Sequence, residues 1–273
     1  MSYRLLALDM DGTLLTSSKV ISRATLEALR VCEERGVAVA LCTGRGAAEL
    51  VDYRDDLRGI ARYGSLVSGG LVYDFGAEAP IAVEAMDTDV ALSIIEQGIR
   101  EDAMIHILAV KESVVRPEDI RRMDKVGMGI YVPMFKKCCT FVEDLASYVR
   151  SHEGTIVKVN LYHHDTSARE RSREALGKLP LTLVDAEETS LESTAQGITK
   201  ARGLKRLCGH LGIGLDECVM VGDAPNDLEV LRVVGCPVAM GNATPEVKAV
   251  AHDVVASNDE DGIVEVVHRI VFA

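Results

Sequence analysis

The stretch "LLALDMDGTLL", residues 5–15, places two carboxylates directly after an apolar run. Four apolar residues precede Asp9, as in a strand that is covered on both faces. Asp9 and Asp11 are two residues apart, so in an extended chain both side chains point to the same side while Met10 points away. Two like charges at this spacing favour a bound cation or a shared proton. The stretch therefore predicts a buried strand that ends in a chemical site.

The segments around this stretch predict a Rossmann-like sheet. "SRATLEALRVCEERG" (22–36) has the apolar periodicity of a helix that begins after Ser22 and stops at Gly36, and "VAVALCTGR" (37–45) is typical of a second strand. Further short apolar runs that precede polar turns occur at 65–74, 218–227, 237–246 and 252–262. Continuous apolar strands that alternate with helices predict an α/β, doubly wound parallel sheet with helices on both faces.

Residues 83–188 follow a different pattern, in which apolar runs are separated by helix-like segments. We expect them to form an inserted α+β domain. The segments on either side, 1–82 and 189–273, are then expected to form one α/β core domain from both ends of the chain. With 273 residues, the chain is long enough for one large core and a smaller one.

"TIVKVNLY" (155–162) shows a clear alternation within this insert. Its apolar face consists of Val157, Val159 and Leu161, and its other face carries Ile156, Lys158, Asn160 and Tyr162. A period of two predicts a sheet with one packed face and one open face. The neighbouring residues His163 and His164 point to opposite faces of a strand, so we expect surface histidines rather than a metal pair.

Composition excludes several classes of protein. The net charge of −12 repels a nucleic-acid backbone and an anionic membrane, so we expect neither as a partner. No apolar run approaches the ~20 residues of a membrane helix, and the first residues lack the layout of a secretory signal. The seven cysteines are scattered and form no CxxC pair, which argues against a disulfide framework or a thiolate zinc site. We expect a soluble, cytoplasmic protein.

Polar residues follow several of the predicted core strands. Asp9, Thr43, Ser68 and Asp223 each stand at the carboxyl end of a strand, where ligands gather in open parallel sheets. "GDAPND" (222–227) adds Asp227 as a further acid. A hard, oxygen-preferring cation suits such a site, and Mg²⁺ fits best because it accepts few carboxylates, water and a substrate phosphate.

These residues carry a family resemblance. "DMDGT" (9–13), "TGR" (43–45), Lys200 in "GITKARG" and "GDAPND" (222–227) resemble the four ordered motifs of the haloacid dehalogenase superfamily. The insert lies between the second and third motifs, and residues 238–267 resemble the C-terminal part of the Cof-type phosphatases, which carry a large cap domain. At two positions the sequence departs from the motifs that are common in this family. Ser68-Gly69-Gly70 stands where Asn-Gly is common, and Ala224-Pro225 replaces a pair that contains glycine.

The resemblance implies a role for each matching acid. Asp9 would attack phosphorus to give an aspartyl phosphate. Asp11 would protonate the leaving alcohol and then activate the water that releases phosphate. Mg²⁺ would be held by Asp9, the backbone carbonyl of Asp11 and Asp223, with Asp227 in or just outside the coordination shell.

The other matching residues are implied to bind the phosphoryl group. Thr43, the Gly44 N–H and Lys200 would hold the transferring oxygens, where phosphoryl-transfer catalysis mostly lies. Asn226 of the fourth motif is assigned to substrate binding. Because every phosphomonoester presents the same phosphoryl group, we expect the insert to select the substrate. Its candidates are Lys158, Asn160 and Tyr162, and a plain solvent-exposed face is the alternative.

The resemblance predicts a Mg²⁺-dependent phosphomonoester hydrolase that acts on small phosphorylated metabolites, with sugar phosphates as the leading class. One alternative is a phosphosugar mutase or phosphotransferase, in which a second hydroxyl accepts the phosphoryl group instead of water. The other is a non-catalytic sensor that binds a phosphometabolite. The intact Asp9/Asp11 pair argues against a sensor, since a sensor needs no nucleophile.

Overall fold

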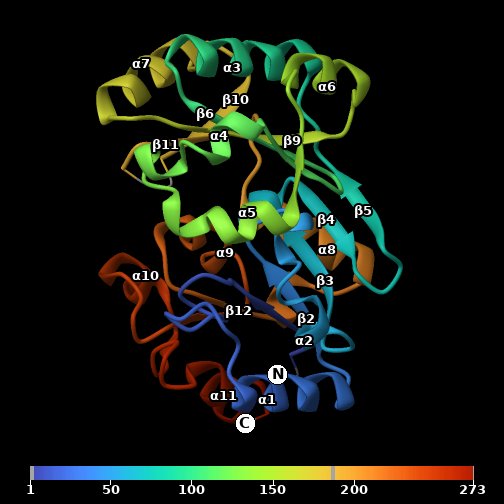
Figure 1. The fold of residues 1–273 in the computed structure, drawn as a ribbon. Coiled ribbons are helices and arrows are strands. Elements are labelled where there is room, and N and C mark those ends of the chain that lie inside the picture. Colours follow the sequence, from blue (N-terminus) through green and yellow to red (C-terminus); the bar gives the residue numbers. More distant parts are fainter. Residues whose placement is uncertain (1–2, 186–187, 273) are drawn as a thin grey trace. The chain divides into compact units, whose positions relative to one another are not determined.

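The computed structural model describes residues 3–185 and 188–272. Within them the chain divides into two compact units, which are described separately. The core unit comprises Met1–Gly44, Asp52–Ala82 and Thr199–Ala273, and the insert unit comprises Arg45–Val51 and Val83–Ile198. Figure 1 shows the elements of both. The chain therefore passes between the two units after Gly44, Val51, Ala82 and Ile198.

The described part of the core unit is built on a sheet of eight strands in the order β14-β13-β12-β1-β2-β3-β4-β5. The strands are β1 (Leu5–Leu8), β2 (Ala38–Cys42), β3 (Ala61–Leu66), β4 (Leu71–Asp74), β5 (Ala79–Val83), β12 (Cys218–Gly222), β13 (Cys236–Ala239) and β14 (Asp253–Val254). Pairing is parallel from β14 to β3, and β4 runs antiparallel to β3. This mostly parallel sheet confirms the predicted α/β core.

Helices cover both faces of this sheet. They are α1 (Arg23–Glu34), α2 (Arg54–Leu57), α8 (Lys200–Leu211), α9 (Leu228–Leu231), α10 (Pro245–Val250) and α11 (Gly262–Val266). Figure 1 shows α1 and α11 side by side on one face, with α9 and α10 on the other. The predicted limits of α1 are confirmed, because the Ser22 hydroxyl accepts the Thr25 N–H and Gly36 has a φ of +79°. None of the described helices is long and apolar enough to cross a membrane.

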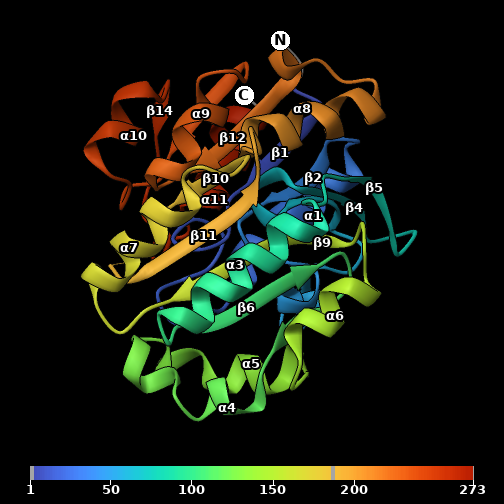
Figure 2. The same ribbon diagram turned by 90° about the horizontal axis from the view of Figure 1, so that it is seen from above.

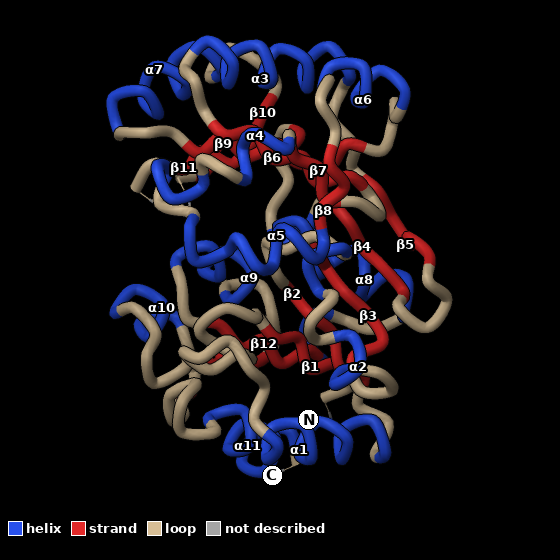
Figure 3. Tube along the Cα trace, viewed as in Figure 1, coloured by secondary structure: helices blue, strands red, loops and turns tan. Residues whose placement is uncertain are grey.

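The described part of the insert unit contains a sheet of six strands in the order β10-β11-β9-β6-β7-β8. They are β6 (Met104–Ala109), β7 (Ser113–Val115), β8 (Cys139–Phe141), β9 (Ile156–Tyr162), β10 (Leu181–Val184) and β11 (Ser190–Ala195). The helices are α3 (Thr88–Arg100), α4 (Pro117–Ile120), α5 (Val132–Cys138), α6 (Leu145–Ser151) and α7 (Thr166–Leu176). Figure 3 shows α3, α6 and α7 on one side of the sheet and α4 and α5 on the other.

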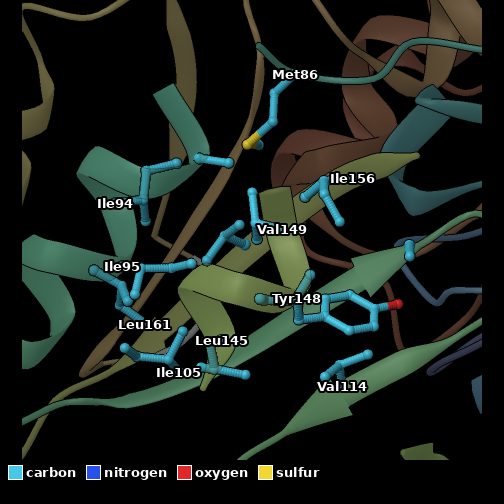
Figure 4. Close-up of a cluster of buried hydrophobic side chains, with 14 of the residues drawn as sticks. Met86, Ile94, Ile95, Ile105, Val114, Leu145, Tyr148, Val149, Ile156 and Leu161 are labelled. Atoms are coloured by element: carbon cyan, nitrogen blue, oxygen red, sulfur yellow. The ribbon is translucent and has the colours of Figure 1, made fainter. Parts of the chain in front are cut away.

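The side of this sheet that faces α3, α6 and α7 is apolar. Figure 2 shows α3 lying along β6 and β9, and Figure 4 shows buried side chains of α3 and α6 packed against the strands of the sheet. Ile105, Val159 and Leu161 project from the strands into this cluster, and Ile94 and Val149 meet them from α3 and α6. Burial of such side chains stabilises the folded state by about 1.5–3 kcal/mol each.

The prediction of an open face on β9 was wrong. All seven residues of β9 are buried, and Lys158 and Asn160 are only 1 % and 4 % exposed. Around Tyr162, the polar side of the strand is covered by a second cluster that contains Met104 and Phe135 of α5. A period of two shows only that the two faces of a strand differ, and here the Tyr162 end of the polar face is packed against apolar side chains rather than open to water.

Three further expectations differ from the structure. β11 pairs with β9 in the insert sheet, although 189–273 was expected to belong to the core. Residues 45–51, expected in the core segment 1–82, group with the insert unit. His163 is buried rather than at the surface, because its Nδ1 donates to the Thr189 carbonyl oxygen and its Nε2 lies 2.9 Å from Ser172 Oγ. His164 is exposed.

Candidate active site

Asp9 leaves the end of β1 as a buried carboxylate, only 5 % exposed. Its N–H donates to the Val221 carbonyl oxygen and so continues the β1–β12 pairing. The chain then turns through Gly12, which has a φ of +83°. A Cβ at Gly12 would lie 2.3 Å from Asp223 Oδ2, so only glycine lets the loop pass this close to that carboxylate.

Lys200 connects the first and fourth motifs. It is the first residue of α8, whose preceding residue, Thr199, accepts the Arg202 N–H with its side chain. Lys200 Nζ lies 2.7 Å from Asp9 Oδ1 and 2.7 Å from Asp227 Oδ1, and all three side chains are buried. An ammonium in the first turn of a helix opposes the helix dipole, so the two carboxylates are what stabilise it there.

Two glycines bring α8 close to the end of β3. A Cβ at Gly69 would lie 2.0 Å from the Thr199 carbonyl oxygen, and one at Gly203 would lie 2.5 Å from Gly69 Cα. Gly69 also has a φ of +99°, which L-residues rarely adopt. The backbones can touch because neither residue has a side chain, and this contact places Lys200 against Asp9.

Asp223 and Asp227 follow β12 in a short turn. Asp227 is fully buried, and its Oδ2 accepts the N–H groups of Asp223 and Ala224 at 3.1 and 3.3 Å. Asp223 Oδ1 accepts a 2.8 Å hydrogen bond from Thr13 Oγ. Pro225 starts a single 3₁₀ turn there, so the Ala224-Pro225 departure leaves both acids bound in place.

The three buried or half-buried acids form one cluster. Asp9, Asp223 and Asp227 each offer an oxygen within 4.8 Å of the others. Burial raises the pKa of Asp9 to about 7, against the opposing effect of Lys200, and burial likewise raises the pKa of Asp223 to about 6. Three carboxylates thus surround one ammonium, and a bound cation would favour their ionised forms. These oxygens suit a hard divalent cation.

Thr43 and Gly44 follow β2 beside this cluster in the sheet order. The Thr43 N–H donates to Ser65, and the Ser68 N–H donates to the Thr43 carbonyl oxygen, each over 3.0 Å. Val67 and Ser68 have left-handed φ values of 52° and 56°. Non-glycine residues in this region cost of order 1–3 kcal/mol, and such strain is concentrated at functional sites.

Comparison with known proteins identifies this arrangement. A family model for haloacid dehalogenase-like hydrolases matches residues 6–267. The chain belongs to this family. The hydrolase is 27 % identical to the putative phosphatase YxeH of Bacillus subtilis, over 99 % of each chain. It is 29 % identical to the HMP-PP phosphatase of Serratia proteamaculans, over 90 % of this chain and 87 % of that protein.

A solved structure extends this likeness to the fold. The haloacid dehalogenase-like hydrolase from Bacteroides thetaiotaomicron superposes with a TM-score of 0.86 at 26 % identity, over 98 % of this chain and 100 % of that one. The resemblance drawn from the four motifs is therefore confirmed at the level of the family. The family places the chain among the hydrolases.

Two residues of the predicted site lie apart from the acidic cluster of the hydrolase. Asn226 is exposed. Among the described residues, the acids whose oxygens lie within 4.8 Å of one another are Asp9, Asp223 and Asp227. The Asp11 carboxylate has Lys19 Nζ 2.7 Å from its Oδ1. Sequence reasoning missed Lys19, since an exposed lysine eight positions after an acid in a loop carries no periodic signal. It also missed Thr13, whose place in the first motif was the available signal.

The candidate residues of the insert unit lie on one face of β9 and form their own polar group. Lys158 Nζ lies 2.5 Å from Glu192 Oε2, and Asn160 Nδ2 donates to the Tyr162 hydroxyl over 3.3 Å. Among the described residues, Asn160 Oδ1 and His106 Nδ1 have no hydrogen-bond partner although both are buried. These two residues are direct neighbours across the β6–β9 pair. Buried polar atoms without partners cost about 1–3 kcal/mol each.

Proposed function

We propose that this hydrolase is a Mg²⁺-dependent phosphomonoester hydrolase that acts through an aspartyl phosphate on Asp9. The observation that carries the proposal is the ion pair of Lys200 with Asp9 and Asp227, two acids 218 positions apart in the chain, with Asp223 in the same cluster. A buried carboxylate beside a shared ammonium and further acids is the arrangement that nucleophilic attack on a phosphate requires.

The reaction divides into two displacements. In the first, an Asp9 oxygen bonds to phosphorus as the bond to the leaving oxygen breaks, and the proton of the Asp11 carboxyl group passes to that oxygen. The product is a free alcohol. In the second, water attacks the same phosphorus and gives a proton to Asp11, which releases inorganic phosphate and restores the Asp9 carboxylate. General acid–base help of this kind contributes about 10²–10⁴-fold.

The donor set fits one divalent cation. Asp9, Asp223 and the Asp11 backbone carbonyl would hold it, while Asp227 orients the turn through its bonds to Lys200 and to two N–H groups. Bound Mg²⁺ would supply positive charge that offsets the repulsion between Asp9 and a phosphate dianion.

The phosphoryl oxygens would be held by groups at the ends of β2 and α8. An ammonium has three N–H donors, and Lys200 gives two of them to carboxylates, so the third suits a phosphoryl oxygen. Thr43 and the Gly44 N–H stand at the end of the strand next to β1 and are assigned to the same oxygens. Asn226 is exposed in the turn after β12 and is assigned to the substrate.

We further propose that the insert unit is a substrate-selecting cap domain and that the substrates are small phosphorylated metabolites, sugar phosphates first among them. The polar face of β9 supports this, because Lys158, Asn160 and the Tyr162 hydroxyl are hydrogen-bonding groups held in a buried layer. The name of the Serratia relative, an HMP-PP phosphatase, supports a small phosphorylated substrate. The cysteines, all of them free thiols in the described chain, suit the cytoplasm.

The test is a phosphate-release screen of the purified chain against a broad set of phosphorylated metabolites with Mg²⁺. Release of inorganic phosphate without an added acceptor is expected, whereas transfer only to a second hydroxyl would indicate a mutase. Asp9→Asn is the matched control, because the amide keeps the shape of the side chain but is no nucleophile. A folded Asp9→Asn protein with near-normal release would overturn the mechanism, and binding without any turnover would indicate a sensor.

Selection by the insert is tested separately with Asn160→Ala. The relative kcat/KM among good substrates should change by about 1–3 kcal/mol, with a smaller effect on an aryl phosphate. Gln97→Ala is the control, since it removes another buried amide of the same unit, on α3. If both variants lowered kcat/KM by the same factor on every substrate, Asn160 would be assigned to stability alone.

A further inference from the structure

Asn242 lies in the turn that follows β13 and uses both ends of its side-chain amide. Its Nδ2 donates to the Gly12 carbonyl oxygen over 2.8 Å, and its Oδ1 accepts the Asn258 N–H over 3.1 Å. An amide suits these two partners because it is a donor at one end and an acceptor at the other. A carboxylate would place a second acceptor against the Gly12 carbonyl oxygen.

Gly12 is the part of the first motif that passes closest to Asp223. A Cβ at Gly12 would lie 2.3 Å from Asp223 Oδ2, and the next residue, Thr13, donates its hydroxyl to Asp223 Oδ1 over 2.8 Å. The residue before it, Asp11, carries the backbone carbonyl that is proposed as a metal ligand. Because glycine allows backbone rotations that other residues resist, an outside contact is needed to hold this peptide in one orientation. Asn242 makes such a contact.

The turn that carries Asn242 is itself bound to the end of β12 through its backbone. The Thr244 N–H donates to the Asp223 carbonyl oxygen over 3.0 Å, and the Met240 N–H donates to the Gly222 carbonyl oxygen over 3.1 Å. Neither bond uses the side chain of Asn242, so both can persist when that side chain is removed. The amide therefore connects the first motif to a turn that is anchored beside Asp223.

We propose that Asn242 is a positioning residue for the metal site, an inference that rests on the proposed function. By holding the Gly12 carbonyl oxygen, its amide fixes the stretch of backbone between the Asp11 carbonyl and Thr13, and with it the placement of two proposed donors, the Asp11 carbonyl and Asp223. Mg²⁺ demands near-octahedral geometry, so displaced donors should bind it less tightly. Groups that hold the ligands of a metal commonly change its affinity by about 10–100-fold.

The experiment measures Mg²⁺ binding to the purified chain, first treated with EDTA and then freed of it. Isothermal titration calorimetry without substrate gives the dissociation constant, which Asn242→Ala should raise about tenfold. Asn258→Ala is the matched control. It removes a 2.8 Å side-chain hydrogen bond to the Leu15 carbonyl oxygen of the same loop, but it keeps the N–H that Asn242 accepts. This control should leave the dissociation constant unchanged.

Turnover gives a second readout. In Asn242→Ala, the Mg²⁺ concentration that gives half-maximal phosphate release should rise by about the same tenfold factor. The kcat at saturating Mg²⁺ should return close to the wild-type value, because the substitution removes no group that touches the substrate. A loss of kcat that saturating Mg²⁺ does not restore, together with an unchanged dissociation constant, would contradict a role in metal binding.

The remaining outcomes separate this inference from the proposed function. Equal increases of the dissociation constant in Asn242→Ala and Asn258→Ala would assign the effect to the loop as a whole and overturn the role of Asn242. A lower thermal midpoint in EDTA with unchanged Mg²⁺ affinity would reduce the contact to a structural one. A wild type that binds no Mg²⁺ would overturn this role along with the metal site. A wild type that binds Mg²⁺ but releases no phosphate would overturn the proposed hydrolase alone, and weaker Mg²⁺ binding by Asn242→Ala would still support the positioning role.

Discussion

Asp9 and Asp11 are two residues apart and have different surroundings. Asp9 is buried, and its oxygen is bound to a buried lysine of α8. Asp11 is half-buried, and its oxygen is bound to an exposed lysine of the loop that follows. When two acids of one site have such unlike environments, they are suited to different tasks, one as nucleophile and one as proton carrier.

This division predicts the behaviour of Asp11→Ala. Turnover of an alkyl phosphate should fall by about 10²–10⁴-fold, because the leaving oxygen then departs without a proton. With 4-nitrophenyl phosphate the first step persists and the second is slow, so phosphate should accumulate on the protein. Rapid quenching followed by intact-mass measurement detects the added phosphate. A loss of less than threefold on the alkyl phosphate would rule out this role.

For single residues, the sequence predicts which side chains belong to the site better than it predicts which side chains contact one another. The acids and Lys200 follow from motifs and from their places at strand and helix ends, and the structure brings Asp9, Lys200 and Asp227 within hydrogen-bonding distance. The contact of Lys19 with Asp11 depends on a left-handed turn at a lysine, which local propensity disfavours. Neighbouring loops and Tyr53 impose that turn, so no pattern near Lys19 could indicate it.

At the scale of elements, the position of α8 depends on the contact of Gly69 with Thr199 and Gly203. Gly69→Ala should destabilise the protein by about 2–4 kcal/mol, from the left-handed conformation and from overpacking, and should lower activity because Lys200 moves with its helix. Urea unfolding and phosphate release measure the two effects.

Gly59→Ala is the matched control for this substitution. Gly59 has a φ of +72°, but a Cβ there would meet nothing within 4 Å. Only the conformational cost of about 1–2 kcal/mol should remain, with activity unchanged. If both substitutions changed the free energy of unfolding and the activity equally, the close contact at Gly69 would contribute nothing to stability or to the position of Lys200.

The buried histidine of β6 gives the insert unit a pH dependence. Burial lowers the pKa of His106 to about 3, so the folded state stays unprotonated where the unfolded state, with a pKa near 6.5, binds a proton. Stability should therefore fall as the pH drops from about 6.5 toward 3, with about 2 kcal/mol lost by pH 5. His106→Asn should show a smaller difference between urea unfolding at pH 7 and at pH 5. An identical difference would exclude His106 as the source.

Prediction of whole elements succeeds where one physical signal dominates. Buried parallel strands such as β1 and β2 consist of uninterrupted apolar residues, and α1 has a serine at its start and a left-handed glycine after its end. β9 shows where this fails. The Tyr162 end of its polar face packs against Phe135 of α5, which lies about twenty residues earlier in the chain, and alternation within the strand carries no information about such a partner.

At the scale of the whole molecule, an acidic chain with three clustered carboxylates around one ammonium should be stabilised by a divalent cation. Mg²⁺ at a hundred times its dissociation constant would add about 2.7 kcal/mol to the free energy of unfolding, visible as a higher thermal midpoint than in EDTA. Asp223→Asn should lose that shift.

Ca²⁺ should bind without supporting turnover. Its metal–oxygen bonds are longer and more numerous than those of Mg²⁺, which binds oxygen ligands at ~2.1 Å in octahedral geometry. Full activity in chelator would contradict the metal site.

The short segment Arg45–Val51 has a practical consequence for anyone who wishes to give this enzyme a new specificity. The segment begins with the last residue of the second motif, yet it belongs to the insert unit. A Cβ at Gly46 would lie 3.2 Å from Leu108, and Ala47, Glu49 and Leu50 are buried. A graft that exchanged only 83–198 for the equivalent part of a relative would leave these side chains against a foreign surface, with apolar groups open to aggregation. Chimeras that transplant both stretches together should yield soluble protein more often than those that transplant one.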